Sequence, residues 1–297
     1  MKALSGLFRL TRPVNMLICA LSVISAALLS CKPLSVAATL LSDISALTYN
    51  SAGIRVLSAA LSAALILAAG NVFNDVCDLE TDRINAPHRP IVSGAVSVGL
   101  ATLFAIALTI AGLILAYTLS ISVMALAACA ALLLFLYDIR LKGRPLLGNI
   151  TVAFLGGIAF IYGGIAGDCV TQSFVPAVFA VLLHLGRELI KDVLDYEGDL
   201  AAGIRTVATV SGTHSACRIA SFALSLLAIA TLAPYALGYF GKSYIGIIAL
   251  TVWPPLGYAM RAALKFPTQD ALNRASLLLK VAMPAGLLAV LVGFQGI

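Results

Sequence analysis

The sequence predicts an all-α, polytopic membrane protein with nine transmembrane helices. Hydrophobic residues make up 61% of the 297-residue chain and charged residues 11%, with a mean hydropathy of +1.04. A soluble domain carries about 25% charged residues, so this chain cannot cover a water-exposed surface. Nine segments are long enough to cross a bilayer core, and their middles hold no Asp, Glu, Lys or Arg.

The nine predicted spans follow one another along a single domain of residues 1–297. Their approximate bounds are 13–31, 54–74, 97–117, 119–137, 148–167, 173–190, 217–238, 243–261 and 278–296. The first span lacks a clear cleavage motif and eight more follow it, so we expect it to be retained rather than removed as a signal peptide. The semi-polar segment 32–53 is expected outside, as an interfacial helix or as a disordered loop.

Basic residues are divided unevenly between the two sets of loops. One side carries the N-terminal cations and most of the later ones, namely Lys2, Arg9, Arg12, Arg83, Arg89, Arg140, Lys142, Arg144, Lys191, Arg205, Arg218, Arg261, Lys265 and Arg274. The other side offers little beyond Lys32, Arg55 and Lys242. The positive-inside rule therefore predicts a cell-membrane protein with a cytoplasmic N-terminus and an external C-terminus. This bias also explains the net charge of +6, which requires no nucleic-acid partner.

Nine of the thirteen acidic residues fall into two clusters. The first cluster follows the second span and contains Asp75, Asp78, Glu80 and Asp82. The second follows the sixth span and contains Glu188, Asp192, Asp195, Glu197 and Asp199. Adding 117 to the four positions of the first cluster gives an acid of the same type in the second. This register predicts an internal repeat of about four helices, roughly 13–137 and 148–261, followed by a ninth helix, with both clusters on the cytoplasmic side.

The spacing within each cluster is helical. Residues 71, 75, 78 and 82 step by four, three and four, and so do residues 188, 192, 195 and 199. Each set is therefore expected on one face of a helix. Two facing stripes of carboxylates repel each other unless cations are present. Acids in the loops of a membrane protein are often merely solvated, but two matching stripes favour a binding site.

The residue types in the stripes indicate which ligand they bind. Carboxylates and amides are hard oxygen ligands that suit Mg²⁺ or Ca²⁺, and the spacing differs from that of an EF-hand. Mg²⁺ is usually held by a few carboxylates and completed by substrate phosphates. Arg83, Arg89, Lys142 and Arg205 lie near enough in the sequence to neutralise a diphosphate. Since the helices beneath are apolar, the pattern predicts a lipid diphosphate as the ligand.

A prenyl diphosphate in such a site would react by losing its diphosphate to give an allylic cation. Mg²⁺ would stabilise the charge that develops on the leaving group, and a membrane-embedded site would exclude water from the cation. The acceptor would then attack C1 of the prenyl chain and lose a proton, for which an aspartate not fully engaged with metal is a candidate base.

Three stretches resemble signatures of the UbiA superfamily of intramembrane prenyltransferases. The stretch "NDVCDLETDRINAPHRPIVSG" is similar to its first acidic signature, through Asn74, Asp75, Asp78 and Asp82. The stretch "KDVLDYEGDLAAGIRT" is similar to the second, through Asp192, Asp195 and Asp199. The stretch "YDIRLKGRPLLGN" resembles a tyrosine–lysine segment after the fourth helix, through Tyr137, Lys142 and Asn149. The resemblance implies nine helices around a central cavity, capped by the 2–3 and 6–7 loops, and Mg²⁺-dependent prenyl transfer in a lipid bilayer.

The predicted site therefore combines three sets of residues. The catalytic set is Asp75, Asp78, Asp82, Asp192, Asp195 and Asp199. The metal-binding set is Asn74, Asp78, Asp82, Asp195 and Asp199. The substrate-binding set is Arg12, Asn15, Asn74, Arg83, Arg89, Tyr137, Lys142, Asn149, Lys191 and Arg205. Arg12 can also be read as a snorkelling residue at the membrane edge, and His184 as a helix–helix hydrogen-bond partner rather than a base.

The identity of the acceptor is the least constrained part of the prediction. Arg12–Asn15 ("RPVN") and the second acidic stretch look most like the branch that adds a geranylgeranyl group to geranylgeranylglyceryl phosphate. Aromatic acceptors (4-hydroxybenzoate, homogentisate or dihydroxynaphthoate) and a chlorophyllide stay open. A secondary transporter is the rival from another class, but its acids would lie near the bilayer midplane rather than at one face. A CDP-alcohol phosphotransferase would carry one acidic motif of different glycine content, and the sequence has no such motif.

Overall fold

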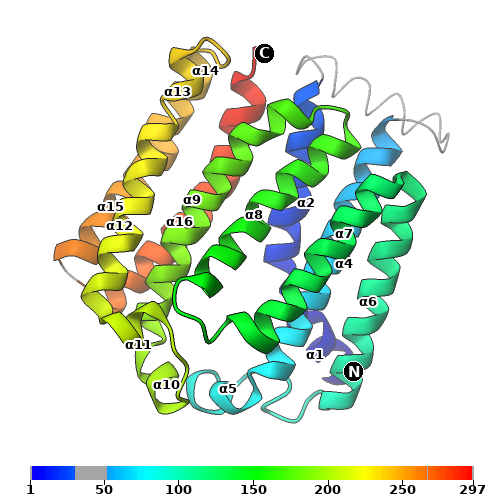
Figure 1. Cartoon of the computed structure of the whole chain (residues 1–297), viewed down its shortest axis with the longest axis vertical. Coiled ribbons are helices and arrows are strands. Elements are labelled where there is room, and N and C mark those ends of the chain that lie inside the picture. The colour runs from blue at the N-terminus through cyan, green and yellow to red at the C-terminus, as the bar shows by residue number, and fades with distance from the viewer. Residues whose placement is uncertain (1, 31–51, 266, 296–297) are drawn as a thin grey trace.

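The protein is a bundle of long helices (Figure 1). The computed structural model describes residues 2–30, 52–265 and 267–295. Within these residues there is no regular strand, and one isolated bridge joins Phe240 to Phe294. In the described part of the chain, eight helices are long and apolar enough to cross a membrane, and a ninth span results if α1 (Lys2–Leu10) and α2 (Pro13–Ala27), which are bent by 43°, count as one. The predicted all-α polytopic fold is confirmed.

The helices agree with the predicted spans. In order after α2 and the short 3₁₀ turn η1 (Leu28–Ser30), they are α4 (Ala52–Cys77), α6 (Val98–Leu119), α7 (Ile121–Leu136) with the π turn η2 (Tyr137–Leu141), α8 (Leu147–Ala166), α9 (Val170–Leu194), α12 (Thr213–Ala230) with α13 (Ala233–Ala236), α14 (Lys242–Ile247) with η3 (Ile248–Val252) and α15 (Trp253–Lys265), and α16 (Gln269–Gly293). The segment expected at 32–53 lies, apart from its last two residues, outside the described residues.

Three helices extend beyond their predicted apolar segments. Helix α4 continues to Cys77 and α9 to Leu194, and α16 begins at Gln269, nine residues before the predicted start at 278. Thr268 caps α16 by accepting a hydrogen bond from the Ala271 N–H at 3.3 Å. Hydropathy detects only the lipid-facing part of a helix, so these polar extensions are missed. They carry acids and bases out of the hydrocarbon.

The helices close into a ring. Helix α4 packs against α2 and α6, α7 lies between α6 and α8, and α8 contacts both α2 and α9. Helix α9 packs against α12, α12 against α15, and α15 against α16. Helix α16 packs in turn against α9 and α2, which closes the ring. The first and last spans of the chain are therefore neighbours (Figure 1). The two predicted repeat units meet where α8 packs against α7 and α2.

Glycines on α8 allow its close approach to neighbouring helices. A Cβ at Gly163 would lie 2.2 Å from the Val23 carbonyl oxygen of α2, and one at Gly157 would lie 3.1 Å from the Ala177 carbonyl oxygen of α9. Gly156 instead faces the His184 ring, where a Cβ would lie 2.4 Å from Cδ2. Gly156 also lines a cavity, so the glycines of α8 contribute both to close helix packing and to the cavity wall.

Two short helices cover one end of the bundle. Helix α5 (Leu79–Asn85) follows α4, and α10 (Tyr196–Ala201) follows α9 and precedes α11 (Val207–Ser211). Helices α5 and α10 contact each other, as expected for a cap built from the 2–3 and 6–7 loops. The N-terminal helix α1 lies at this same end and the C-terminus lies at the other (Figure 1).

Candidate active site

The two acidic motifs share one local backbone geometry. Helix α4 gives way to α5 at Asp78, with φ −88° and ψ 7°, and α9 gives way to α10 at Asp195, with φ −92° and ψ 4°. Hydrogen bonds between residues four apart continue through both breaks, at 2.8–2.9 Å from the N–H groups of residues 78, 82, 195 and 199. The acids of each motif therefore stay on one side of the chain while the helix changes direction. The breaks fall at positions 117 residues apart.

Protein cations neutralise the carboxylates of the first motif. Arg12 contacts the Asp75 Oδ1 at 2.5 Å, and Arg89 bridges Asp75 at 3.1 Å and Asp82 at 2.5 Å. Lys142 forms an ion pair with Asp78. All three carboxylates are buried. Arg12 comes from the α1–α2 junction, where φ is 54°, and Arg89 from the segment after α5. Cations from distant parts of the chain thus neutralise the negative charge of the first motif.

Asn74 connects the first motif to the π turn η2. Its Oδ1 accepts a hydrogen bond from Arg12 at 3.0 Å, and its Nδ2 donates to the Asp138 Oδ1 at 2.7 Å. The wider π turn ends at Leu141, immediately before Lys142. Isolated π turns are frequent at functional sites. Here the turn presents an acid and the following base to the same motif.

The second motif is compensated only at its start. Asn149 donates to the Asp192 Oδ2 at 3.0 Å, and the buried Glu188 pairs with Arg187 at 3.2 Å and with Lys191 at 2.9 Å. Among the residues the structure describes, the carboxylates of Asp195 and Asp199 form no ion pair or hydrogen bond. Asp199 is buried and Asp195 is exposed to solvent.

The two motifs lie close enough to interact electrostatically. Asp199 is influenced by Asp195, by Lys142 and by Asp78 of the first motif. Burial, followed by repulsion from Asp195, raises the pKa of Asp199 to about 6. Burial also raises the pKa of Asp82, although the neighbouring Arg89 opposes the change. Tyr137 of η2 lies within electrostatic range of acids in both motifs. The two stripes therefore face one site.

The chemistry of this site fits a hard divalent cation. In the described part of the chain, no three His, Cys, Asp or Glu side chains are already arranged to bind a metal ion. However, a buried carboxylate without a cationic partner is costly to ionise, and a cation beside Asp199 would relieve that cost. Carboxylate and amide oxygens are the donors that Mg²⁺ takes, with substrate oxygens and water completing the shell.

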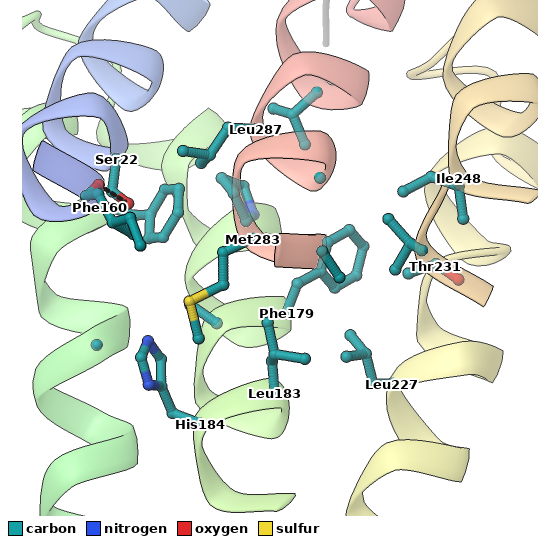
Figure 2. A pocket seen from close by; sticks show the side chains of 18 residues that line it. Ser22, Phe160, Phe179, Leu183, His184, Leu227, Thr231, Ile248, Met283 and Leu287 are labelled. Carbon is teal, nitrogen blue, oxygen red and sulfur yellow. Dashed lines mark hydrogen bonds between the residues drawn. The ribbon is translucent and has the colours of Figure 1, made fainter. Parts of the chain in front are cut away.

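An apolar cavity lies within the bundle. Its volume is about 80 Å³, and its wall comes from α2, α8, α9, α12, the segment after α12, η3 and α16. Figure 2 shows Phe160, Phe179, Leu183, His184, Met283 and Leu287 around it. His184 is four residues before Glu188, so the cavity wall leads along α9 towards the second motif.

Some predicted site residues are not joined to this cluster. Arg83 is exposed and pairs with Glu80 at 2.8 Å, and Arg205 is exposed on the segment before α11. The half-buried Asn15 makes no side-chain hydrogen bond with the described residues. Conversely, the sequence assigned no role to Asp138, Arg187 and Lys280. Asp138 lies four residues before Lys142, and that spacing within a polar stretch was a usable signal.

An acidic site at one end of an all-helical membrane bundle, beside an apolar cavity, defines an integral membrane enzyme for an amphiphilic substrate. The model of the UbiA prenyltransferase family matches residues 35–282, and the chain belongs to that family of prenyltransferases.

Named relatives extend the likeness over most of the chain. The digeranylgeranylglyceryl phosphate synthase of Methanopyrus kandleri is 35% identical over 95% of this chain and 96% of its own. The synthase of the same name from Metallosphaera sedula is 36% identical, over 79% of this chain and 82% of its own. A solved structure described as addressing digeranylgeranylglyceryl phosphate synthase in membranes has a TM-score of 0.73 and 30% identity over 99% of both chains. A UbiA homologue from Archaeoglobus fulgidus, solved with GPP and Mg²⁺, shares the fold with a TM-score of 0.67 and 19% identity over 96% of this chain and 99% of its own.

Proposed function

We propose that this enzyme transfers a geranylgeranyl group from geranylgeranyl diphosphate to geranylgeranylglyceryl phosphate, with Mg²⁺ as cofactor. The acceptor is supported by the relatives named digeranylgeranylglyceryl phosphate synthase, which match this chain over most of its length. Metal dependence is supported by the fold neighbour bound to GPP and Mg²⁺. The observation in this chain that carries the proposal is the Asp195–Asp199 pair, whose carboxylates form no ion pair with a described residue and which lies within electrostatic range of Lys142 and Asp78.

The proposed metal ligands are Asn74, Asp78, Asp82, Asp195 and Asp199. When Mg²⁺ is bound, it supplies Lewis-acid stabilisation of the diphosphate leaving group. Lys142 and Arg89 now neutralise Asp78 and Asp82. If these carboxylates held Mg²⁺, Lys142 and Arg89 would be available to donate hydrogen bonds to diphosphate oxygens. The ion pairs of the first motif are thus a resting arrangement of groups that serve the substrate. Tyr137, Asn149 and Lys191 are proposed to line the same site, whereas the exposed Arg83 and Arg205 lie outside the cluster.

The reaction breaks the bond between C1 of the prenyl chain and the diphosphate oxygen, which keeps the bonding electrons. The acceptor hydroxyl oxygen forms the new bond to C1 and releases its proton. Asp75 and Asp192, which lie outside the proposed metal set, are the candidate bases. The apolar wall of the cavity excludes water, which would otherwise capture the cation.

The orientation follows from the charges at the two ends of the bundle. Helix α1, which carries Arg9, lies at the same end of the bundle as the cap helices α5 and α10 (Figure 1). Arg140 lies in η2, which is joined to the first motif by the hydrogen bond from Asn74 to Asp138. We place this end in the cytoplasm and the C-terminus outside the cell membrane. Both substrates are amphiphiles and would enter from the bilayer.

An acceptor panel tests the proposal. Purified protein in detergent or nanodiscs is incubated with labelled geranylgeranyl diphosphate, Mg²⁺ and one of geranylgeranylglyceryl phosphate, 4-hydroxybenzoate, homogentisate or dihydroxynaphthoate. The expected product is digeranylgeranylglyceryl phosphate, lost when EDTA replaces Mg²⁺. Transfer to an aromatic acceptor only would overturn the acceptor assignment, and a product formed equally well in EDTA would overturn the metal dependence.

A further inference from the structure

A group of four cations lies where the first and last spans meet the second acidic motif. Lys280 of α16 is close enough to Arg187, Arg12 and Lys191 to interact electrostatically with all three. Arg187 also donates to the Ser276 carbonyl oxygen at 3.4 Å, which ties α9 to α16 one turn before Lys280. We call Arg12, Arg187, Lys191 and Lys280 the basic cluster.

The basic cluster has an excess of positive charge. Arg187 and Lys191 share the single carboxylate of Glu188. Arg12 shares Asp75 with Arg89. The half-buried Lys280 has no ion pair or hydrogen bond with any residue that the structure describes. Glu188 and the shared Asp75 therefore neutralise only part of the charge of the four cations, and a further anion among them would be favourable.

The basic cluster also stands at one end of the apolar cavity. Lys280 precedes the cavity-lining Met283 by three residues and Leu287 by seven, so all three share a face of α16. Arg187 follows the cavity-lining His184 by three residues on α9. In Figure 2, the His184 and Met283 side chains, one from each of these helices, both line the pocket. Cations at the end of an apolar cavity suit an amphiphile with an anionic head and a hydrocarbon tail.

We propose that the basic cluster, with Lys280 as its key cation, binds the phosphate monoester of the acceptor lipid, separately from the diphosphate of the donor. A phosphate monoester carries a charge of about −1.5 to −2 near neutral pH, which matches the excess of the cluster. Arginine and lysine are the usual donors to phosphate oxygens. The donor diphosphate has its own cations, Arg89 and Lys142, next to the first motif. This inference rests on the proposed function, because it presumes a phosphorylated acceptor.

Steady-state kinetics with two acceptors test the assignment. Wild-type protein and the variants Lys280→Met and Lys280→Arg are compared using geranylgeranyl diphosphate and either geranylgeranylglyceryl phosphate or its dephosphorylated form, geranylgeranylglycerol. Lys280→Met should raise the KM for the phosphorylated acceptor at least about tenfold, the effect of losing one charged hydrogen bond. It should change the donor KM and the rate with geranylgeranylglycerol by less than about twofold, and Lys280→Arg should restore most of the affinity.

A matched control is Arg274→Gln, which removes one exposed cation from the same helix. It should leave both KM values unchanged. An unchanged acceptor KM in Lys280→Met, or equal losses with both acceptors, would overturn the inference alone. A rise in the donor KM instead would assign the cluster to the diphosphate. If the loss of activity in Lys280→Met instead depended on the anionic lipid content of the nanodisc, and not on the acceptor phosphate, the cluster would be assigned to bilayer headgroups. If the wild-type protein does not use the phosphorylated acceptor, the proposed function fails and the inference fails with it.

Discussion

The two acidic motifs have the same backbone and opposite electrostatic surroundings. Asp82 and Asp199 occupy equivalent positions 117 residues apart, each in the first turn of a short helix, and both are buried. Asp82 contacts Arg89 at 2.5 Å, whereas Asp199 has no ion pair with a described residue. The same difference separates Asp78, paired with Lys142, from Asp195.

This difference is caused by what packs against each motif. The first motif receives Arg12 from the α1–α2 junction, Arg89 from the segment after α5 and Lys142 from the end of η2. At the second motif, the cations Arg187 and Lys191 are occupied by Glu188, one turn further from the cap. A repeated motif can therefore produce two unlike half-sites. We infer that the second half-site is the one ready to accept a cation.

Loss of activity is the largest effect expected, and it should be symmetric. Asp78→Ala and Asp195→Ala should each lower kcat/KM by about 10³-fold, because both half-sites are needed to stabilise the charge on the leaving diphosphate. The matched controls are Glu80→Gln and Glu197→Gln, also 117 residues apart but exposed. They should retain near-normal rates. Near-normal turnover in either alanine variant would break the model of two cooperating half-sites.

Metal binding without substrate should distinguish the half-sites. At a Mg²⁺ concentration of about 100 times Kd, binding stabilises the folded protein by about 2.7 kcal/mol. We expect Asp199→Asn to abolish this gain, measured as the rise in Tm between EDTA and Mg²⁺. Asp82→Asn should only reduce it, since Asp82 must first leave Arg89. If the two variants lost equal amounts of the Mg²⁺-dependent rise in Tm, Mg²⁺ would not bind first at the second motif.

Stability in EDTA should change in opposite directions for the same pair of variants. Asp82→Asn leaves Arg89 with fewer partners in a partly buried position and should cost about 1–3 kcal/mol. Asp199→Asn removes a buried charge that has no partner and should raise Tm. Both changes in stability can be measured by denaturing each variant in EDTA while its helix content is monitored. A destabilised Asp199→Asn variant would contradict the electrostatic contrast.

The sequence was sufficient for the fold and for the two acidic clusters of the candidate site. Apolar length defines a membrane helix, and the step of 117 residues aligned Asp75, Asp78 and Asp82 with their counterparts. The sequence was not sufficient to predict which cations form ion pairs with these carboxylates. Arg12 and Lys142 reach the first motif across 63 and 64 residues, which no local spacing encodes. Lys280 and Arg187 were missed because they lie near the ends of apolar spans, where a lone cation is easily attributed to the membrane edge.

The smallest expected effect is a pH dependence that belongs to the second motif. The pKa of Asp199 is raised from its ordinary 3.8 to about 6, so the folded protein holds this proton more tightly than the unfolded chain does. Its contribution to the stability of the metal-free protein is therefore fully present below about 3.8 and is lost as the pH rises through about 6. The Tm difference between Asp199→Asn and wild type in EDTA should accordingly be small at pH 4.5 and largest at pH 7. At Asp82 burial also raises the pKa, although Arg89 opposes the shift. Because Asp82→Asn removes an ion-pair partner of Arg89 together with the charge, the lost ion pair should outweigh any gain at pH 7. A difference for Asp199→Asn that does not change with pH would mean that the carboxylate already has a cationic partner, and the contrast between the half-sites would then be lost.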